Sequence, residues 1–285
     1  MRWLVFGGEG LLGRPVARAA RRRGDAVLAL GQEVADLERP EALVAWAREF
    51  RPGVILNAAA FTRVDDCERE EALAMAVNGA GAGHAAAAAA AVGARFVHVS
   101  TDYVFAGTAS TPYLETATAA PQTAYGRSKL AGERQALAHP GALVVRTSWL
   151  FGAGGPNFVD TMLALAARGE RRIRVVADQT GAPTYAPPLA AAILDLVARG
   201  AEGIVHYRDR EPVTWAGFAR AIFDEWLPAV EIVPVTTAEV PRPARRPAYS
   251  VLDVSTAEAL LGRRVALWHS GLVAHLNQHR AERRH

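Results

Sequence analysis

In the first half of the chain, short apolar runs alternate with longer stretches that are amphipathic or rich in alanine. Four short apolar runs are typical of buried strands, and longer amphipathic or alanine-rich stretches between them are typical of helices. Gly24 follows the first of these helices as a C-cap. The predicted strands are Trp3–Phe6, Ala26–Leu30, Val54–Leu56 and Phe96–Val99, and the predicted helices are 11–23, 40–50 and 72–92.

This order predicts an α/β fold, because strands separated by helices of this length join through right-handed crossovers into a parallel sheet. The second half has a less regular pattern. It predicts helices over 159–168, from Pro187 to near Gly200, and from Thr214 as N-cap to Trp226, with strands at 173–176 and 204–207. The basic stretch 241–247 reads as an extended loop suited to phosphate groups, or as an exposed linker.

Composition narrows the class of protein. About half of the residues (51%) are hydrophobic and 21% are charged, as in a globular chain, and the net charge is only +3. The arginine clusters at 21–23 and 280–284 read as a solvated helix end and a frayed terminus rather than a nucleic-acid surface. A single cysteine, Cys67, no signal-peptide pattern and no apolar stretch long enough to cross a bilayer predict a cytoplasmic protein without a membrane partner.

Three glycines mark a candidate nucleotide site. Gly7, Gly10 and Gly13 lie between the first strand and the first helix, where a dinucleotide fold places its pyrophosphate loop; the alternative is a glycine-rich turn with no ligand. The second strand ends Leu30-Gly31-Gln32 without the acid that usually binds the NAD ribose. Arg14 could face a 2′-phosphate, so we expect NADPH, with NADH possible.

Tyr125 and Lys129 form the strongest candidate for catalysis. They are four residues apart at the start of a predicted helix and therefore share one face. Lys129 is also the only lysine among 32 basic residues, so a compact ammonium is kept here where arginine serves everywhere else. The alternative is that both are ordinary surface residues.

Five motifs, in order, resemble the extended short-chain dehydrogenase/reductase family. They are Gly7-x-x-Gly10-x-x-Gly13, Asn57-Ala58-Ala59-Ala60, Ser100-Thr101-Asp102-Tyr103-Val104-Phe105, Tyr125-x-x-x-Lys129-Leu130-Ala131-Gly132-Glu133 and Arg146-Thr147-Ser148-Trp149, with later likeness at Asp178–Thr184 and Arg246–Asp253. The resemblance implies a Rossmann-like doubly wound parallel sheet (1–150 and 185–212) and a smaller α/β substrate-binding domain (151–184 and 213–285). It also implies reduction of the 4-keto group of dTDP-4-dehydro-L-rhamnose by NADPH to give dTDP-L-rhamnose.

The resemblance implies a catalytic set of Thr101, Tyr125 and Lys129. Ketone reduction needs a proton donor as well as a hydride, and a phenol with a pKa of about 10 is a poor donor near neutrality unless a cation lowers that pKa. We therefore expect Lys129 to lower the pKa of Tyr125 and, as the family implies, to bind the nicotinamide ribose. Thr101 would orient the carbonyl oxygen; alone, it would read as a turn or cap residue.

Two further sets of residues follow from the same resemblance. The expected cofactor-binding residues are Gly7, Gly10, Leu11, Leu12, Gly13, Arg14, Asp36, Leu37, Asn57, Ala58, Ala59, Ala60, Tyr125 and Lys129. The expected substrate-binding residues are Asp102, Tyr103, Trp149, Asn157, Gln179 and Arg246, of which Arg246 would meet the substrate diphosphate. Asp102 and Trp149 could equally be a helix-capping acid and a core indole.

Alternatives of other classes remain open. Dehydratases of this superfamily carry a second acid where Tyr103 stands, which argues against water elimination and leaves a reductase or an epimerase. A non-catalytic NADP-binding subunit, like the β subunit of methionine adenosyltransferase, is a further possibility. His84, His98 and the terminal histidines show no metal-ligand spacing, and Pro15 replaces an acid that some relatives use for magnesium, so no metal is expected. A homodimer is possible.

Overall fold

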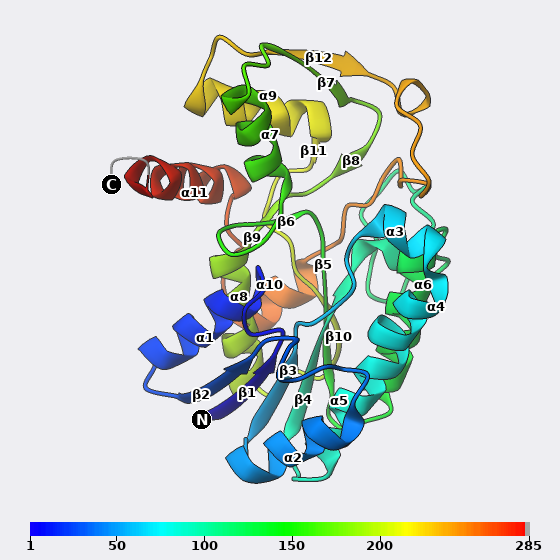
Figure 1. Ribbon diagram of the computed structural model, residues 1–285, viewed down its shortest axis with the longest axis vertical. Coiled ribbons are helices and arrows are strands. Elements are labelled where there is room, and N and C mark those ends of the chain that lie inside the picture. The colour runs from blue at the N-terminus through cyan, green and yellow to red at the C-terminus, as the bar shows by residue number, and fades with distance from the viewer. Residues whose placement is uncertain (283–285) are drawn as a thin grey trace.

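The computed structural model describes residues 1–282. Of the terminus predicted to be frayed, 280–284, residues 280–282 are instead helical and Arg280 donates to Asn277, while 283 and 284 lie outside the described residues. The centre of the structure is a six-stranded sheet in which every pairing is parallel (Figure 1). The strand order is β10 (Gly203–His206), β5 (Leu143–Thr147), β4 (Arg95–Thr101), β3 (Val54–Asn57), β1 (Arg2–Phe6) and β2 (Ala26–Leu30). This confirms the predicted α/β doubly wound fold and its first four strands.

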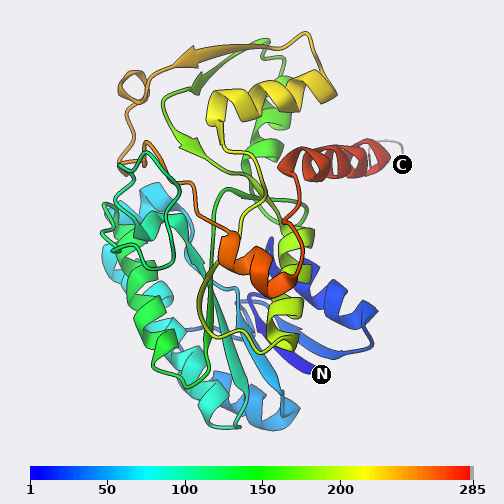
Figure 2. The same ribbon diagram turned by 180° about the vertical axis from the view of Figure 1, so that it is seen from behind.

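Helices cover both faces of the sheet, and alternate residues of each strand supply the two cores. In β1, Trp3 and Val5 face one core, which includes α1 (Gly13–Arg22) and α8 (Ala186–Ala198). Leu4 and Phe6 face the other, which includes α2 (Pro40–Phe50), α5 (Gly81–Ala90) and the end of α6 (Ala124–Leu137). The two helical layers lie on opposite sides of the sheet in both views (Figures 1 and 2).

The helix predicted over 72–92 is present as one continuous helical stretch over 71–90, but its α-helical pattern is interrupted. After α3 (Val64–Arg69), the chain forms α4 (Glu71–Ala74), a π-helical segment η1 (Met75–Ala80) that was not predicted, and then α5. Asn78, inside the π-helical segment, donates to the Phe61 carbonyl and the Ser128 hydroxyl and accepts from the Phe61 N–H. These tertiary bonds accompany the wider helical turn, and π-helical turns of this kind are frequent at functional sites.

A smaller domain is built on the strands β7 (Arg172–Val176) and β12 (Glu231–Val235), which pair in parallel. The helices α7 (Phe158–Ala167), α9 (Trp215–Trp226) and α11 (Trp268–Glu282) pack into its separate core, which includes Phe218 and Leu272. The short pairs β6 (Leu150–Phe151) with β9 (Thr184–Tyr185), and β8 (Thr180–Gly181) with β11 (Val213–Thr214), join it to the large sheet. Two 3₁₀ segments, η2 (Asp102–Val104) and η3 (Thr237–Glu239), complete the elements.

One segment does not follow the predicted domain division. We expected all of 213–285 in the smaller domain, but α10 (Ser255–Leu261) packs on α8, and Val254, Ala257 and Val265 belong to the core of the large sheet. The chain therefore returns to the large domain before α11 leaves it again. No helix within residues 1–282 is both long and apolar enough to span a bilayer.

Candidate active site

Most of the predicted site residues gather at the carboxyl edge of the large sheet. Gly7 follows β1, Asn57 ends β3 and Thr101 ends β4, and the register places Phe6 beside Asn57 and Asn57 beside His98. Helices after β1 and β3 lie on opposite faces, so this edge is the switch point where open α/β sheets bind ligands.

The glycine loop is shaped by contacts that a Cβ atom would prevent. Gly7 has φ +73°, and a Cβ there would lie 2.6 Å from the Ala59 nitrogen. At Gly13, a Cβ would lie 2.1 Å from the Gly7 carbonyl oxygen. The loop therefore delivers Leu11, Leu12 and Gly13 to the start of α1, whose first turn contains no acidic residue. A helix N-terminus without a competing carboxylate fits a dinucleotide pyrophosphate.

An acidic residue that the sequence pattern did not identify, Glu9, lies close to Arg14. Arg14 Nε donates to the Glu9 carbonyl at 2.6 Å, and a Cβ on Gly31 would lie 2.7 Å from a Glu9 carboxylate oxygen. Glu9 thus sits beside the end of β2 together with Arg14. Sequence reasoning missed it because it looked for this acid after the second strand.

The other predicted cofactor residues differ in which backbone and side-chain groups remain available to a ligand. Asp36 accepts from the Glu38 N–H, and the Leu37 side chain is buried against Gly81 while its carbonyl faces His84 Nδ1 at 2.7 Å. Neither Leu37 group is therefore free for a ligand. The segment Ala58, Ala59 and Ala60 is half-buried directly after Asn57, with its backbone at the edge of the glycine loop.

Thr101 and Tyr125 meet where β4 ends. The phenol of Tyr125 lies beside the Thr101 side chain, and the Thr101 hydroxyl donates to Asp102 at 3.0 Å and accepts from the Tyr103 N–H. Burial raises the pKa of Tyr125 above its ordinary value, and the neighbouring Thr101 side chain opposes that rise. The phenol is therefore held in its protonated form.

Lys129 shares the helical face of Tyr125 and is not among the main influences on the pKa of that phenol, so the expected pairing stays a prediction. Its Nζ donates to the Val99 carbonyl at 2.7 Å and lies 3.4 Å from His98 Nε2. Burial lowers the pKa of Lys129 to about 8, although the nearby Glu133 carboxylate raises it. The only lysine of the chain is thus a buried amine bound to β4.

Behind Lys129 lies a chain of buried polar groups that starts at the backbone. The Ala59 N–H donates to Asn57 Oδ1 at 3.1 Å, so the Asn57 amide nitrogen is directed to His98 Nδ1 at 3.2 Å. His98 Nδ1 then accepts from that amide, and Lys129 Nζ lies 3.4 Å from Nε2 on the other side of the ring. Burial and then the lysine charge hold the pKa of His98 well below its usual value. Sequence analysis treated His98 as a structural residue, although a polar residue within an apolar strand was a signal.

Two small residues and one ion pair fix α6 in place. A Cβ on Gly126 would lie 2.2 Å from the Tyr103 carbonyl oxygen, and one on Gly132 would lie 2.2 Å from the Asn78 carbonyl oxygen. Glu133 forms a buried, two-bond pair with Arg146 of β5, at 2.8 and 2.7 Å. Most of the motif after Lys129 therefore positions the helix on the sheet.

Asp102 and Tyr103 line opposite sides of the turn after Thr101. Burial raises the pKa of Asp102 to about 6, while the hydroxyls of Ser250 and Thr101 lower it. Tyr103 stacks edge-on against Tyr125, with ring centroids 5.6 Å apart. Its hydroxyl accepts from Arg246 Nη1 at 3.1 Å.

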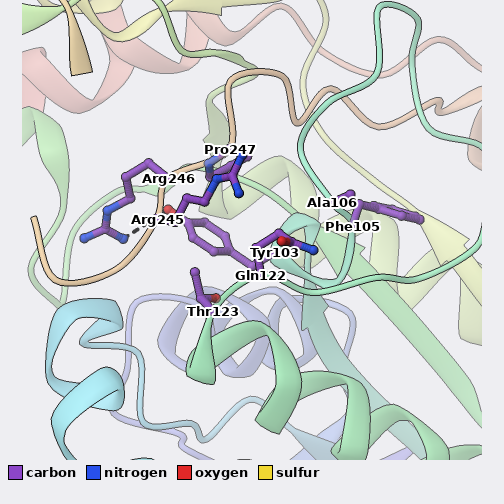
Figure 3. Close-up of a pocket in the computed structure, with 8 residues that line it drawn as sticks. All are labelled: Tyr103, Phe105, Ala106, Gln122, Thr123, Arg245, Arg246 and Pro247. Atoms are coloured by element: carbon purple, nitrogen blue, oxygen red, sulfur yellow. Dashed lines mark hydrogen bonds between the residues drawn. The ribbon is translucent and has the colours of Figure 1, made fainter. Parts of the chain in front are cut away.

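Arg246 is held between the two domains. Its Nη2 binds Asp65 of α3 at 2.8 Å, and Asp65 also accepts from the Ala244 N–H. A shallow pocket opens here beside the start of α6, with two guanidinium groups on one side (Figure 3). Its lining is Tyr103, Phe105, Ala106, Gln122, Thr123, Arg245, Arg246 and Pro247. Sequence analysis missed the anchoring role of Asp65.

The remaining three predicted substrate residues are partly occupied by the protein itself. Trp149 has φ +45° and stacks on Trp215 with centroids 3.4 Å apart, so one indole face is covered. Gln179 is buried and donates to Thr237 at 2.9 Å. Asn157 caps α7 and donates to the Gly152 and Gly155 carbonyls.

Comparison with known proteins agrees with this architecture. The family model described as RmlD substrate binding domain matches residues 1–281. A dTDP-4-dehydrorhamnose reductase of Burkholderia thailandensis is 42% identical, with 94% of this chain and 95% of that protein covered. A probable dTDP-4,6-dihydroxy-2-methyloxan-3-one 4-ketoreductase of Streptomyces antibioticus is 45% identical, covering 88% and 86%. A crystal structure of a Bacillus anthracis dTDP-4-dehydrorhamnose reductase in complex with NADP superposes with a TM-score of 0.93 at 35% identity, covering 97% and 99%. The resemblance predicted from the motifs is confirmed.

Proposed function

This chain belongs to the RmlD family, and on that premise we propose that it reduces the 4-keto group of dTDP-4-dehydro-L-rhamnose with NADPH to give dTDP-L-rhamnose. The position of the Thr101 side chain beside the Tyr125 phenol at the carboxyl end of β4 carries the proposal. It places two hydroxyl groups together at the sheet edge beside the glycine loop. The name of the Burkholderia relative and the NADP in the Bacillus structure support the substrate and the cofactor.

In this reaction the protein's own residues supply orientation and a proton. NADPH, when bound along the glycine loop, supplies the hydride. Thr101 and Tyr125 hydrogen-bond the carbonyl oxygen, and Tyr125 gives its proton to the alkoxide as it forms. Since burial keeps the phenol protonated, Tyr125 is in the form that a reduction requires. Lys129, with a pKa of about 8, keeps its proton at neutral pH and is held in place by the Val99 carbonyl.

The nucleotide portion of the substrate needs cationic groups at a distance from the carbonyl. Arg245 and Arg246 line the pocket next to Tyr103 and supply these cationic groups. One guanidinium group can donate two parallel hydrogen bonds to the oxygens of a phosphate. We place the sugar near Asp102 and Trp149, the residues expected to bind it. We infer the cytoplasm as its place of action, since nucleotide sugars are its proposed substrates.

A second candidate is reduction of another dTDP-linked 4-keto sugar, which the name of the Streptomyces relative favours. Absorbance of NADPH followed with dTDP-, UDP- and GDP-linked 4-keto sugars separates the two. Oxidation with a different dTDP sugar alone would replace the first candidate. NADPH binding without turnover of any ketone would favour the non-catalytic subunit.

The assignment of Tyr125 is tested with Tyr125→Phe. We expect kcat to fall about 10²–10⁴-fold, the usual contribution of general acid catalysis, with NADPH binding retained. Tyr103→Phe is the matched variant, because its hydroxyl faces Arg246; it should change the KM for the nucleotide sugar and leave kcat near the parent value. Parent-like turnover by Tyr125→Phe would refute the proposed proton donor.

A further inference from the structure

A second cluster of chemically active side chains lies in the smaller domain, between α7 and α11. Asp160 is in the first turn of α7, and His275 and His279 are four residues apart on α11, so both imidazoles lie on one helical face. His275 Nε2 and His279 Nε2 each lie 2.8 Å from the same oxygen, Asp160 Oδ1. The three ligand atoms all lie within 4.8 Å of one another.

We propose that Asp160, His275 and His279 bind a divalent transition-metal ion, with zinc as the best-fitting ion. Two nitrogens and one carboxylate oxygen form the three-residue ligand set of open zinc sites. At metal–ligand bonds of about 2.0–2.1 Å, ligands at tetrahedral angles lie roughly 3.3 Å apart. Each imidazole nitrogen lies 2.8 Å from the carboxylate oxygen, and all three atoms lie within 4.8 Å of one another. Shifts of less than an ångström would therefore let all three atoms bind one ion.

The carboxylate is prepared for such a role. Asn157 Nδ2 donates to Asp160 Oδ2 at 2.7 Å, which orients the carboxylate and leaves Oδ1 to the two histidines. Burial would raise the pKa of Asp160, but the hydrogen bonds from His275 and His279 outweigh burial and hold that pKa below its usual value. Asp160 is therefore an anionic ligand at neutral pH.

The chemistry of the ligands selects the class of ion. Imidazole nitrogen suits zinc, copper, iron and nickel, whereas magnesium and calcium favour oxygen ligands. His275 is buried, while the side chains of Asp160 and His279 are 33% and 28% exposed, so the site is open to solvent on one side. A water molecule can supply the fourth ligand there. His275 Nδ1 has no partner within the described residues, and loss of such an outer partner typically lowers metal affinity about 10–100-fold.

The cluster is separate from the proposed catalytic site. In both views α11 lies on the opposite side of the molecule from α6, which carries Tyr125 and Lys129 (Figures 1 and 2). An ion at this position would bridge α7 and α11 and fasten the last helix to the smaller domain. We therefore expect zinc to raise the thermal stability of the protein and to leave the rate of ketone reduction unchanged.

The test uses the full chain without an affinity tag, dialysed against zinc and analysed for bound metal. The parent protein should hold one zinc ion per chain. His279→Gln and Asp160→Asn should weaken binding by more than the 10–100-fold that an outer partner contributes. His269→Gln is the matched control, because His269 lies on the same helix but faces Glu225 at 3.3 Å, and it should bind like the parent.

Two outcomes would overturn the proposal. One is no zinc bound by the parent; the other is binding of equal strength in all four proteins, which would show an adventitious ion only. Should one variant fail to fold, the other variant and the His269→Gln control still give the comparison with the parent. Cobalt(II) in place of zinc should give the visible absorption of a tetrahedral site, and zinc should displace it with a rise in Tm. An octahedral cobalt spectrum with no change in Tm would count against the site.

Discussion

At the scale of single residues, burial sets the protonation of the groups that do the chemistry. Tyr125 and Lys129 are both almost completely buried, and burial moves their pKa values in opposite directions, up for the phenol and down for the amine. Both shifts favour the neutral form. At neutral pH the phenol is therefore neutral, whereas an amine with a pKa of about 8 still carries its proton, and His98 is neutral behind them.

The lowered pKa of Lys129 predicts a pH dependence of stability. Between the folded pKa of about 8 and the ordinary value of 10.5, the unfolded chain binds more protons than the folded chain, so stability should rise with pH. Lys129→Met removes this titration and should flatten the rise. Urea unfolding of the cofactor-free protein from pH 7.5 to 9.5 measures it, a range that stays below the titration of tyrosines. An unchanged slope in Lys129→Met would contradict the assignment.

Arg14 predicts the choice of cofactor. Arg14→Gln removes the cation expected to face a 2′-phosphate, and a charge-assisted hydrogen bond of about 1.5–3 kcal/mol corresponds to roughly a 10–100-fold rise in the KM for NADPH. The KM for NADH should change little. Arg18→Gln, one turn further along the exposed face of α1, is the control. Equal effects on both cofactors would show that Arg14 does not read the phosphate.

At the scale of elements, the position of α6 depends on close backbone contact with the π-helical segment. Gly132 touches the Asn78 carbonyl with no room for a methyl group, and Asn78 in turn binds Phe61 and Ser128. A shift of α6 would move Tyr125 relative to β4. The glycine in this motif therefore acts on catalysis through packing.

Gly132→Ala should destabilise the protein by about 1–3 kcal/mol, the usual cost of overpacking, and lower kcat as α6 shifts. Gly83→Ala is the matched control. Its added Cβ would meet the end of the flexible Gln135 side chain at 3.1 Å, which can move aside. Denaturant unfolding and NADPH oxidation measure both effects. Equal stability of the two variants would show that the Asn78 contact does not constrain the helix.

How much the sequence could predict also differs by element. The first four strands of the large sheet were predictable because each is mainly an apolar run, and the glycine loop and Tyr125–Lys129 because their spacing is local; β5 was not predicted. The π-helical segment, the direction of the Lys129 amine and the packing of α10 on α8 depend on partners distant in sequence. The meeting of Asp160 with His275 and His279 does too: the two histidines have helical spacing, but the acid lies 115 residues before the first of them.

At the scale of the whole molecule, the two domains are held together by the non-covalent contacts of one loop, in addition to the chain segments that run from one domain to the other. The segment 241–247 leaves the smaller domain and binds Asp65 of the large domain through Arg246, Ala244 and Arg242. The same segment lines the pocket beside Tyr103 (Figure 3). The proposed site for the substrate diphosphate and the contact between the domains therefore use one set of residues.

Arg246→Gln should raise the KM for the nucleotide sugar by about 10–100-fold and change kcat little, because it contacts the distant diphosphate rather than the ketone. Arg242→Gln is the matched control, since that side chain is 57% exposed and reaches Asp65 only at 3.5 Å. Steady-state kinetics over nucleotide-sugar concentration measures the difference. A fall in kcat alone would place Arg246 in positioning the domains instead.

The solitary lysine has a practical consequence. Apart from the α-amino group of Met1, the chain offers amine-directed reagents a single nitrogen, and that nitrogen is sealed beneath β4 and α6. Acylation or reductive methylation at this position can proceed only when α6 and β4 separate transiently and expose the amine. The extent of labelling at Lys129, measured by mass spectrometry, therefore reports how often α6 and β4 separate. A ligand that holds these two elements together should protect Lys129 from the reagent.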